Sequence, residues 1–531
     1  MPTALRLGSH GLVWTMVLVP TLIDLADGWR PVRDDAMISI GSYRVFSGRS
    51  PLVGVWSLAS QGMHHAFFDL GPLLFWLLAV PVHLDPSHGA LWGAALVCGA
   101  SLSLAVEAVW SVKGWPAAVA IALVVADVGW QTQMFTDLVW NPHFGLVFLI
   151  ASAATAWVVA SGRFGWWPLV VVFASVAAQS HLVYAVTAAI LALVAPLAAL
   201  AYGHRPSRWV WLPVGLTAAA ACWILPLVQE VSGHPGNLSL ILDSRRAQPP
   251  VGLGFGFHAL ATAVAPHPIW LTQYPYLLSA ANGTPRYLGG HAVGWSFFAL
   301  GLLVVIGLWA WKADRRELSA LAVVGAVAAV GTVASFAAFA RDKVVLSGYL
   351  INLLWVVGML IWIVALWAMG DLAAVGIRRV RGGHGRLLGQ VPVRRGLEWA
   401  ALLLLVAAAI AGLRTLVPAA HGQAAETRSD SPLDNAIARS VEHSVPPGPV
   451  VVVVQPASFG PRYGYDNIDY WGVALRLLED GWQPGLQDSF FGPATHLSVP
   501  PGARWPKVIV HVDPSTKTVI GVYRAGPIGP G

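Results

Sequence analysis

The chain has 531 residues, of which 56% are hydrophobic and only 11% charged, with a formal net charge of +6. Soluble domains carry about 25% charged residues, and apolar runs of roughly 17–25 residues recur here along most of the chain, so the composition excludes a soluble globular protein and indicates a helical membrane protein. The runs are continuous rather than alternating, which disfavours a closed β-barrel, and the positive charge is spread over loops, which argues against a nucleic-acid partner.

The first apolar run, Gly11 to about Ala26, lacks a small-residue cleavage site and is predicted to be a retained anchor. The polar stretch 28–65 has interspersed apolar residues, which predicts amphipathic helices on the membrane surface. A long loop rich in Gly and Pro is predicted over 228–290. Further membrane runs are expected at about 67–84, 90–111, 115–135, 144–160, 166–180, 183–202, 208–227, 291–311, 317–340, 344–369 and 398–417. The fold prediction is therefore an α-helical polytopic membrane protein with about 11–13 transmembrane helices.

The last part of the chain has the composition of a soluble domain. Val450–Val454 is predicted to be a buried strand, and Asp469–Glu479 has apolar residues at helical spacing. Two more strands are expected at Val508–Val512 and Val519–Tyr523. The chain is thus divided into a membrane domain, 1–418, and a small α/β domain, 419–531.

Positive charge predicts the orientation. The segment 378–395 is the most basic loop and is expected in the cytoplasm, which places the soluble domain outside. A count from the N-terminus places Asp34 outside as well, and both counts put Asp137 there. The two counts disagree by one crossing, so one apolar run between residues 66 and 111 either fails to cross or hides another. The protein is predicted to be a multi-pass plasma-membrane protein with an extracytoplasmic site.

Two adjacent acids, Asp34 and Asp35, follow the first crossing. A helix N-terminus also favours acids, so this pair has a purely structural interpretation. The functional interpretation is a general base, since a positioned carboxylate can take the proton of an attacking hydroxyl. In a partly desolvated loop the second acid raises one of the two pKa values, which makes a base usable near neutral pH.

The stretch from Asp34 to Pro51 resembles the first outer loop of GT-C superfamily glycosyltransferases, most of all the branch of lipid A aminoarabinose transferases and protein O-mannosyltransferases. The chain is also similar in plan to actinobacterial envelope arabinofuranosyl- and mannosyltransferases. The first acid of that loop is catalytic in the family, so the resemblance gives Asp34 the role of base and Asp35 a supporting role.

Three later stretches extend the resemblance over about the first 370 residues. Phe68–Trp76 resembles a segment with a Pro-Pro-Leu core, although this chain has Gly-Pro-Leu and lacks the basic residue that often precedes it. His64 and His65 are the candidates to replace that residue. Asp137 matches a second acidic position, and Arg341 with Tyr349 resembles a late Arg/Tyr stretch.

The resemblance implies transfer of a sugar from a polyprenyl-phosphate donor to an envelope glycan, lipid or protein acceptor on the outer face. Physical reasoning agrees, because nucleotide sugars are not supplied outside the cytoplasm and an activated sugar must arrive there on a lipid. The leaving phosphate is best stabilised by Arg or Lys. The cations in predicted outer loops are Arg341, Lys343, Arg245 and Arg246, for which a snorkelling or solvated role is the alternative.

Trp140-Asn141-Pro142-His143 is a further candidate for sugar binding. Aromatic rings stack on sugar C–H faces, and Asn and His bond hydroxyls, whereas the plain alternative is a helix-terminating turn with an interfacial Trp. His181 interrupts an apolar run, and there a satisfied buried histidine is the more common case.

No cofactor is expected, although a divalent cation on Asp34, Asp35 and Asp137 stays open as an alternative. The alternative function is a membrane transporter or lipid-linked glycan flippase. Such proteins place ionisable residues in the membrane and often show inverted repeats, whereas here the charges lie in predicted loops and no repeat is visible. An envelope scaffold or sensor is a second alternative, and an enzyme of the same face with a different reaction, such as glycan polymerisation or ligation, is a third.

Overall fold

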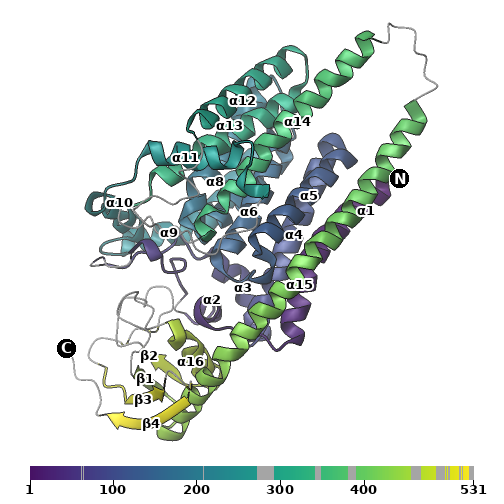
Figure 1. Cartoon of the computed structure of the whole chain (residues 1–531). Coiled ribbons are helices and arrows are strands. Elements are labelled where there is room, and N and C mark those ends of the chain that lie inside the picture. Colours follow the sequence, from purple (N-terminus) through teal and green to yellow (C-terminus); the bar gives the residue numbers. More distant parts are fainter. Residues whose placement is uncertain are drawn as a thin grey trace.

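The structure is a computed structural model of the chain (Figure 1). It describes residues 1–48, 50–60, 63, 65–206, 209–271, 292–340, 348–380, 390–455, 468–485, 497, 499, 503–513, 516 and 518–525.

Helices make up most of the described chain. They are α1 (Pro2–Ala26), α2 (Arg33–Arg44), α3 (Leu73–Leu84), α4 (Gly89–Lys113), α5 (Trp115–Thr132), α6 (Asn141–Ala160), α7 (Trp167–Ser180), α8 (Leu182–Ala201), α9 (Trp211–Ser232), α10 (Asn237–Ala247), α11 (Leu253–Val264), α12 (Gly294–Lys312), α13 (Arg316–Ala337), α14 (Leu353–Val380), α15 (Gln390–Ser444) and α16 (Ile468–Glu479). The strands are β1 (Pro449–Gln455), β2 (Gln483–Gly485), β3 (Lys507–Asp513) and β4 (Thr518–Ala525).

Within the described residues, ten helices are long and apolar enough to cross a membrane: α1, α4, α5, α6, α8, α9, α12, α13, α14 and α15. Three shorter apolar helices cover Leu73–Leu84, Phe164–Ser180 and Leu253–Val264. The polytopic helical fold that composition predicted is confirmed. It places α6 at the centre, with every residue buried, whereas only three residues of α9 are buried, as expected of a lipid-facing helix.

Helix α3 explains why the two topology counts disagreed. Its 12 residues span about 18 Å, well short of a hydrocarbon core of about 30 Å. It packs against the last turns of α2. A Cβ on Gly41 of α2 would come within 2.9 Å of the Phe75 ring near the start of α3, and His83 near its end stacks on Tyr43 at 4.9 Å. The run that fails to cross is therefore Leu73–Leu84.

Helices α1 and α15 run side by side along one edge of the bundle (Figure 1). The 55 residues of α15 extend over about 80 Å, so its second half projects beyond the membrane as a stalk. The domain boundary predicted at residues 418 and 419 falls inside this helix. Asp27 at the end of α1 fixes the start of the stalk, since its carboxylate lies 2.6 Å from His421 and 3.8 Å from Arg428.

The predicted loop over 228–290 is wrong for a large part of its length. Helix α9 continues to Ser232, and α10 and α11 follow within the same stretch. The start of α11 is fixed to the end of α13, where the Val251 amide donates to the Phe339 carbonyl at 2.8 Å. Residues 272–291 lie outside the described chain.

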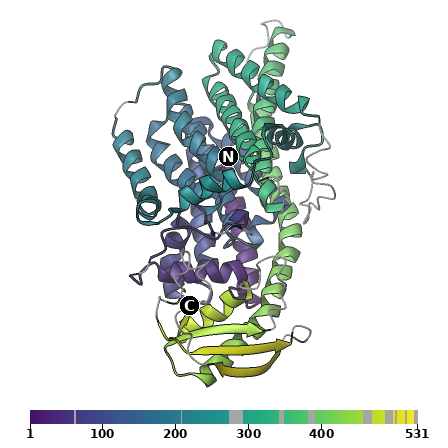
Figure 2. The ribbon, with the colours of Figure 1, turned by 90° about the vertical axis from the view of Figure 1, so that its left-hand side faces the viewer.

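The soluble domain is a four-stranded sheet in the order β2-β1-β3-β4. Strand β1 pairs in parallel with β2 and β3, while β3 and β4 are antiparallel. The predicted strands and the helix over 469–479 are confirmed, and β2 was missed. Helix α16 packs on both α15 and α2, so the domain is seated directly against α2 (Figure 2).

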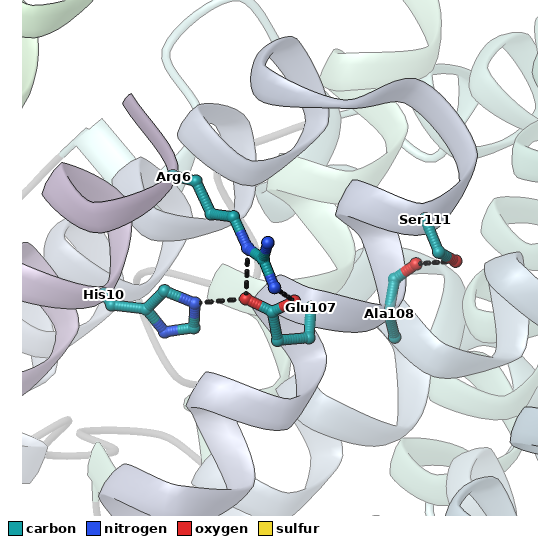
Figure 3. A network of polar contacts seen from close by, with 5 residues as sticks. All are labelled: Arg6, His10, Glu107, Ala108 and Ser111. Atoms are coloured by element: carbon teal, nitrogen blue, oxygen red, sulfur yellow. Dashed lines mark hydrogen bonds and ion pairs between the residues drawn. The ribbon is translucent and has the colours of Figure 1, made fainter. Parts of the chain in front are cut away.

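We call the end of the bundle that carries α2 the acidic end, and the opposite end the basic end. At the basic end, Arg6 Nε donates to Glu107 Oε1 at 2.8 Å and His10 Nε2 lies 2.6 Å from the same oxygen (Figure 3). Lys113 pairs with Glu317 at 3.4 Å there. The charged side chains at this end of the described helices are thus paired, which is favourable at a membrane surface.

Candidate active site

The site begins at the first turn of α2. Arg33 has a φ of 49°, a left-handed value that costs a non-glycine residue about 1–2 kcal/mol. Asp34 and Asp35 follow in the first turn, where the free amide groups of a helix N-terminus favour acids. Gln133, the C-cap residue of α5 four positions before Asp137, also has a positive φ of 55°. Backbone strain at a residue such as Arg33 is often found at functional positions.

Asp34 is held by the indole of Trp140. Trp140 Nε1 donates to Asp34 Oδ2 at 3.0 Å, and Trp140 is the residue that precedes α6. Burial raises the pKa of Asp34 above its ordinary value, while the indole bond and the charge of Arg33 act in the opposite direction. The two predicted site residues Asp34 and Trp140 are thus in direct contact.

Asp35 lies in a different environment from Asp34. It is 6% exposed, and its pKa is raised well above the ordinary value by burial and then by the carboxylates of Asp137, Asp34 and Asp24. The neutral acid is therefore favoured at Asp35. Two neighbouring carboxyl groups in unlike environments separate into an ionisable one and a protonated one, which is the arrangement of many acid–base sites.

Asp24 is a member of this acidic cluster that the sequence interpretation missed. It lies near the end of α1, is 1% exposed, and neither carboxylate oxygen has a hydrogen-bond partner among the described residues. An acid inside an apolar run was the available signal, because intramembrane carboxylates are usually functional.

Aromatic rings form a wall beside Asp34. The Trp140 ring meets His143 and Tyr349 edge-on, with centroids 4.9 and 4.8 Å away. His181 continues the wall, 5.5 Å from Tyr349 and 5.7 Å from Tyr184. Burial lowers the pKa of His181 to about 4, so its imidazole is neutral at physiological pH. The predicted residues Trp140, His143 and Tyr349 are brought together, and His181 joins them.

Asn141 and His143, predicted to bind substrate, also have partners within the protein. Asn141 Nδ2 donates to Asp69 Oδ2 and to the Ser180 carbonyl, both at 2.9 Å. His143 Nδ1 lies 3.1 Å from the Asp137 carbonyl. The amide of Asn141 therefore braces the site, and its role toward substrate stays a prediction.

The remaining predicted residues lie elsewhere. His65 is exposed in the segment between α2 and α3, and Arg245 is exposed near the end of α10, beside an Arg246–Asp243 ion pair of 2.9 Å. His64, Arg341 and Lys343 lie outside the described residues. In the part of the chain that the structure describes, no group of three or more His, Cys, Asp or Glu residues is arranged to hold a metal ion.

Comparison with known proteins identifies the fold. No protein-family profile and no curated protein matches the sequence. The crystal structure of ArnT from Cupriavidus metallidurans bound to undecaprenyl phosphate superimposes with a TM-score of 0.52, at 16% identity, over 95% of this chain and 94% of that one. ArnT is an aminoarabinose transferase of the GT-C superfamily. The chain has the GT-C fold.

Two further solved structures are similar at lower scores. ArnT from the same organism in the apo state gives a TM-score of 0.47 at 17% identity, over 95% of this chain and 93% of that one. The oligosaccharyltransferase of Archaeoglobus fulgidus gives a TM-score of 0.38 at 12% identity, over 87% of this chain and 64% of that one. The ArnT structure that superimposes at a TM-score of 0.52 confirms the GT-C resemblance read from the sequence as a likeness of fold.

Proposed function

We propose that this protein is a glycosyltransferase that moves a sugar from a polyprenyl-phosphate donor to an acceptor, with Asp34 as general base. The observation that carries the proposal is the Asp34 carboxylate held at 3.0 Å by the Trp140 indole, at the start of α2 and beside a wall of rings. The GT-C fold supports it, since the ArnT of similar fold was crystallised with undecaprenyl phosphate.

The reaction follows from the environments of the two acids. The acceptor hydroxyl attacks the anomeric carbon, the bond from that carbon to the phosphate oxygen breaks, and the phosphate leaves with the bonding electrons. Asp34 Oδ takes the hydroxyl proton. The indole N–H and Arg33 favour the ionised form of Asp34, while Asp35 stays neutral and adds no repulsion.

Substrate groups are assigned by chemistry. The rings of Trp140, His143 and Tyr349 offer apolar faces to a sugar, and Asp137 offers an acceptor to its hydroxyls. For the donor phosphate we retain the predicted cations Arg341 and Lys343. Charge-assisted hydrogen bonds from such groups stabilise a departing phosphate.

The acceptor is proposed to approach from the soluble domain. Helix α16 packs against α2, so this domain adjoins the site. We propose that the acidic end faces out of the cell, where the acceptor is an envelope glycan, lipid or protein. The second candidate, a transporter or flippase, is favoured by Asp24, because transporters use buried acids inside a bundle.

The test uses the purified full chain in lipid nanodiscs. Labelled polyprenyl-phosphate mannose and polyprenyl-phosphate arabinofuranose are supplied with a short glycan acceptor, and release of polyprenyl phosphate and the new glycosidic bond are measured. We expect transfer by the parent chain and none by Asp34→Asn. The matched control is Asp243→Asn on the exposed face of α10, which should transfer normally.

Two results would contradict the proposal. The first is undiminished transfer by Asp34→Asn that is folded and inserted. The second is movement of labelled lipid-linked sugar across proteoliposomes without a new glycosidic bond, which would establish the transporter.

A further inference from the structure

Asp69 lies near the end of the segment that joins α2 to α3, four residues before α3 begins. It is 2% exposed, and its main chain pairs with the opposite arm of the segment, where Asp69 N donates to the Val55 carbonyl at 2.8 Å. Gly54 N donates back to the Asp69 carbonyl at 3.0 Å. A Cβ on Gly54 would come within 2.8 Å of Asp69 Cβ, so the two arms are closely packed and the position of Asp69 is fixed.

The Asp69 carboxylate links the ends of three helices. Oδ2 accepts from Asn141 Nδ2 at the start of α6, at 2.9 Å, and Oδ1 accepts from Leu182 N at the start of α8, at 3.2 Å. Asn141 Nδ2 donates also to the Ser180 carbonyl at the end of α7. A buried carboxylate with both oxygens engaged is costly to disturb, because each donor would lose its partner.

The same link controls the direction of Trp140. Asn141 follows Trp140 directly, so the bonds of Asn141 set where the chain enters α6 and from which point the indole projects. The next residue is also fixed, since Tyr184 Oη donates to the Pro142 carbonyl at 2.9 Å. The indole then reaches Asp34 at 3.0 Å.

We propose that Asp69 is a positioning residue for transfer: through Asn141 it fixes Trp140, whose indole holds Asp34. The inference rests on the proposed function, because the placement of Asp34 matters to the reaction only if Asp34 is the base. Asp69 itself touches no substrate in this account and acts through two intervening side chains.

The geometry requires two acceptor oxygens at this position, and burial raises the pKa of Asp69 well above its ordinary value while the bonds from Leu182 and Asn141 oppose that rise. Two N–H groups, of Asn141 and Leu182, point at the two oxygens of Asp69. A carboxamide has one oxygen and one NH₂ group, so Asp69→Asn satisfies one donor and places N–H against N–H at the other. The structure also supplies a matched control. Asn237 accepts from Phe68 N at 2.9 Å and donates to the carbonyls of Phe68 at 3.1 Å and Asp69 at 3.5 Å, so it holds the same main chain from α10 and leaves the bonds of the Asp69 side chain to Asn141 and Leu182 in place.

The test is the pH dependence of polyprenyl phosphate release by the full chain in nanodiscs. For Asp69→Asn we expect kcat to fall roughly 10- to 100-fold, as small errors of placement do, with the donor KM little changed. The acidic limb, which is the part of the pH–rate profile where the rate falls as Asp34 is protonated, should move to higher pH. The reason is that the indole bond favours the ionised form of Asp34, and this bond is lost in the variant. The charged groups around Asp34 and Asp35, which are Arg33, Asp24 and Asp137, are left unaltered.

A double-mutant cycle separates this role from a structural one. In a Trp140→Phe background, Asp69→Asn should move the limb no further, because the two residues act through the same bond. Asn237→Ala should lower thermal stability and leave the limb in place. If Asp69→Asn does not fold, Asn141→Ala breaks the same link from the other side and should move the limb likewise.

Two outcomes overturn the inference. The first is that the acidic limb stays in place in the variant that folds, Asp69→Asn or Asn141→Ala. The second is that in the double mutant with Trp140→Phe the shift of the acidic limb equals the sum of the shifts of the two single mutants. Failure of the proposed function is distinguishable, since it would appear as transfer by Asp34→Asn. If Asp34→Asn is inactive and the acidic limb of Asp69→Asn stays in place, only the positioning role of Asp69 is refuted.

Discussion

Replacing Trp140 by Phe removes the indole N–H and keeps an aromatic ring in the wall beside Asp34. The N–H bonds Asp34 Oδ2 at 3.0 Å and favours the ionised carboxylate, so its loss raises the pKa of Asp34. Only the ionised form accepts the hydroxyl proton. The acidic limb of the rate profile should therefore move to higher pH.

The size of the expected rate loss follows from the strength of the hydrogen bond between the Trp140 indole and Asp34. A hydrogen bond to a charged group contributes about 1.5–3 kcal/mol, and about 1.4 kcal/mol corresponds to a tenfold change in rate. At a pH below the limb, Trp140→Phe should therefore be slower than the parent chain by roughly 10- to 100-fold. Above the limb, where Asp34 is ionised in both proteins, the rates should approach each other.

The assay is release of labelled polyprenyl phosphate across the acidic range in nanodiscs. The control is Trp399→Phe, since Trp399 is exposed on α15 and far along the bundle from α2. A loss that is equal at every pH would refute the reasoning, because it would show that Trp140 acts by contact with the sugar and not on the protonation of Asp34.

Three further predictions concern other parts of the fold. Glu107→Ala unpairs Arg6 at the basic end and should lower the melting temperature in detergent with no change in the acidic limb. His181→Gln should make the protein less sensitive to acid. In the parent chain the pKa of His181 in the folded state, about 4, lies below its ordinary value of 6.5, so the free energy of unfolding is highest above about pH 6.5 and falls as the pH approaches 4. The expected fall between pH 7 and pH 5 is roughly 2 kcal/mol. Gly472→Ala should displace α16 from α15 and lower the rate of sugar transfer, because the added Cβ would collide with the Asp434 carboxylate on α15.

Each of these has a measurement that contradicts it. A moved limb in Glu107→Ala would connect the basic end to the site. An unchanged acid sensitivity of the melting temperature in His181→Gln would show that this histidine is not the group that titrates. For Gly472→Ala the control is Gly370→Ala, where an added Cβ meets nothing within 4 Å, and equal activity of the two variants would separate the soluble domain from the site.

The crossings could be predicted because length and apolarity are local properties. The run expected at 115–135 is α5, Trp115–Thr132, and the strand expected at Val450–Val454 lies within β1. The stalk was missed because the chain beyond residue 418 has the composition of a soluble domain, yet α15 continues as one helix to Ser444. Helix α11 was missed because it is short, with Pro250 and Gly252 just before it and Pro266 just after it.

Part of the candidate site was predictable in its residues, although Asp24 was missed and His65 and Arg245 lie elsewhere, and none of its contacts was predictable. Asp34 and Trp140 were identified separately, the first by resemblance and the second by its chemistry, and only the fold brings them to 3.0 Å. Asp69 and Asn141 are 72 positions apart, and no local pattern records that they meet. Hydrophobic periodicity gives faces and lengths, whereas partners come from tertiary packing.

The central claim is that Asp34 takes the acceptor proton during transfer from a polyprenyl-phosphate sugar. The most direct measurement is single-turnover release of labelled polyprenyl phosphate by the parent chain and by Asp34→Asn, in nanodiscs at neutral pH with acceptor present. The account predicts release by the parent chain and, for Asp34→Asn, loss of release with donor binding retained. Equal release by both proteins would contradict it.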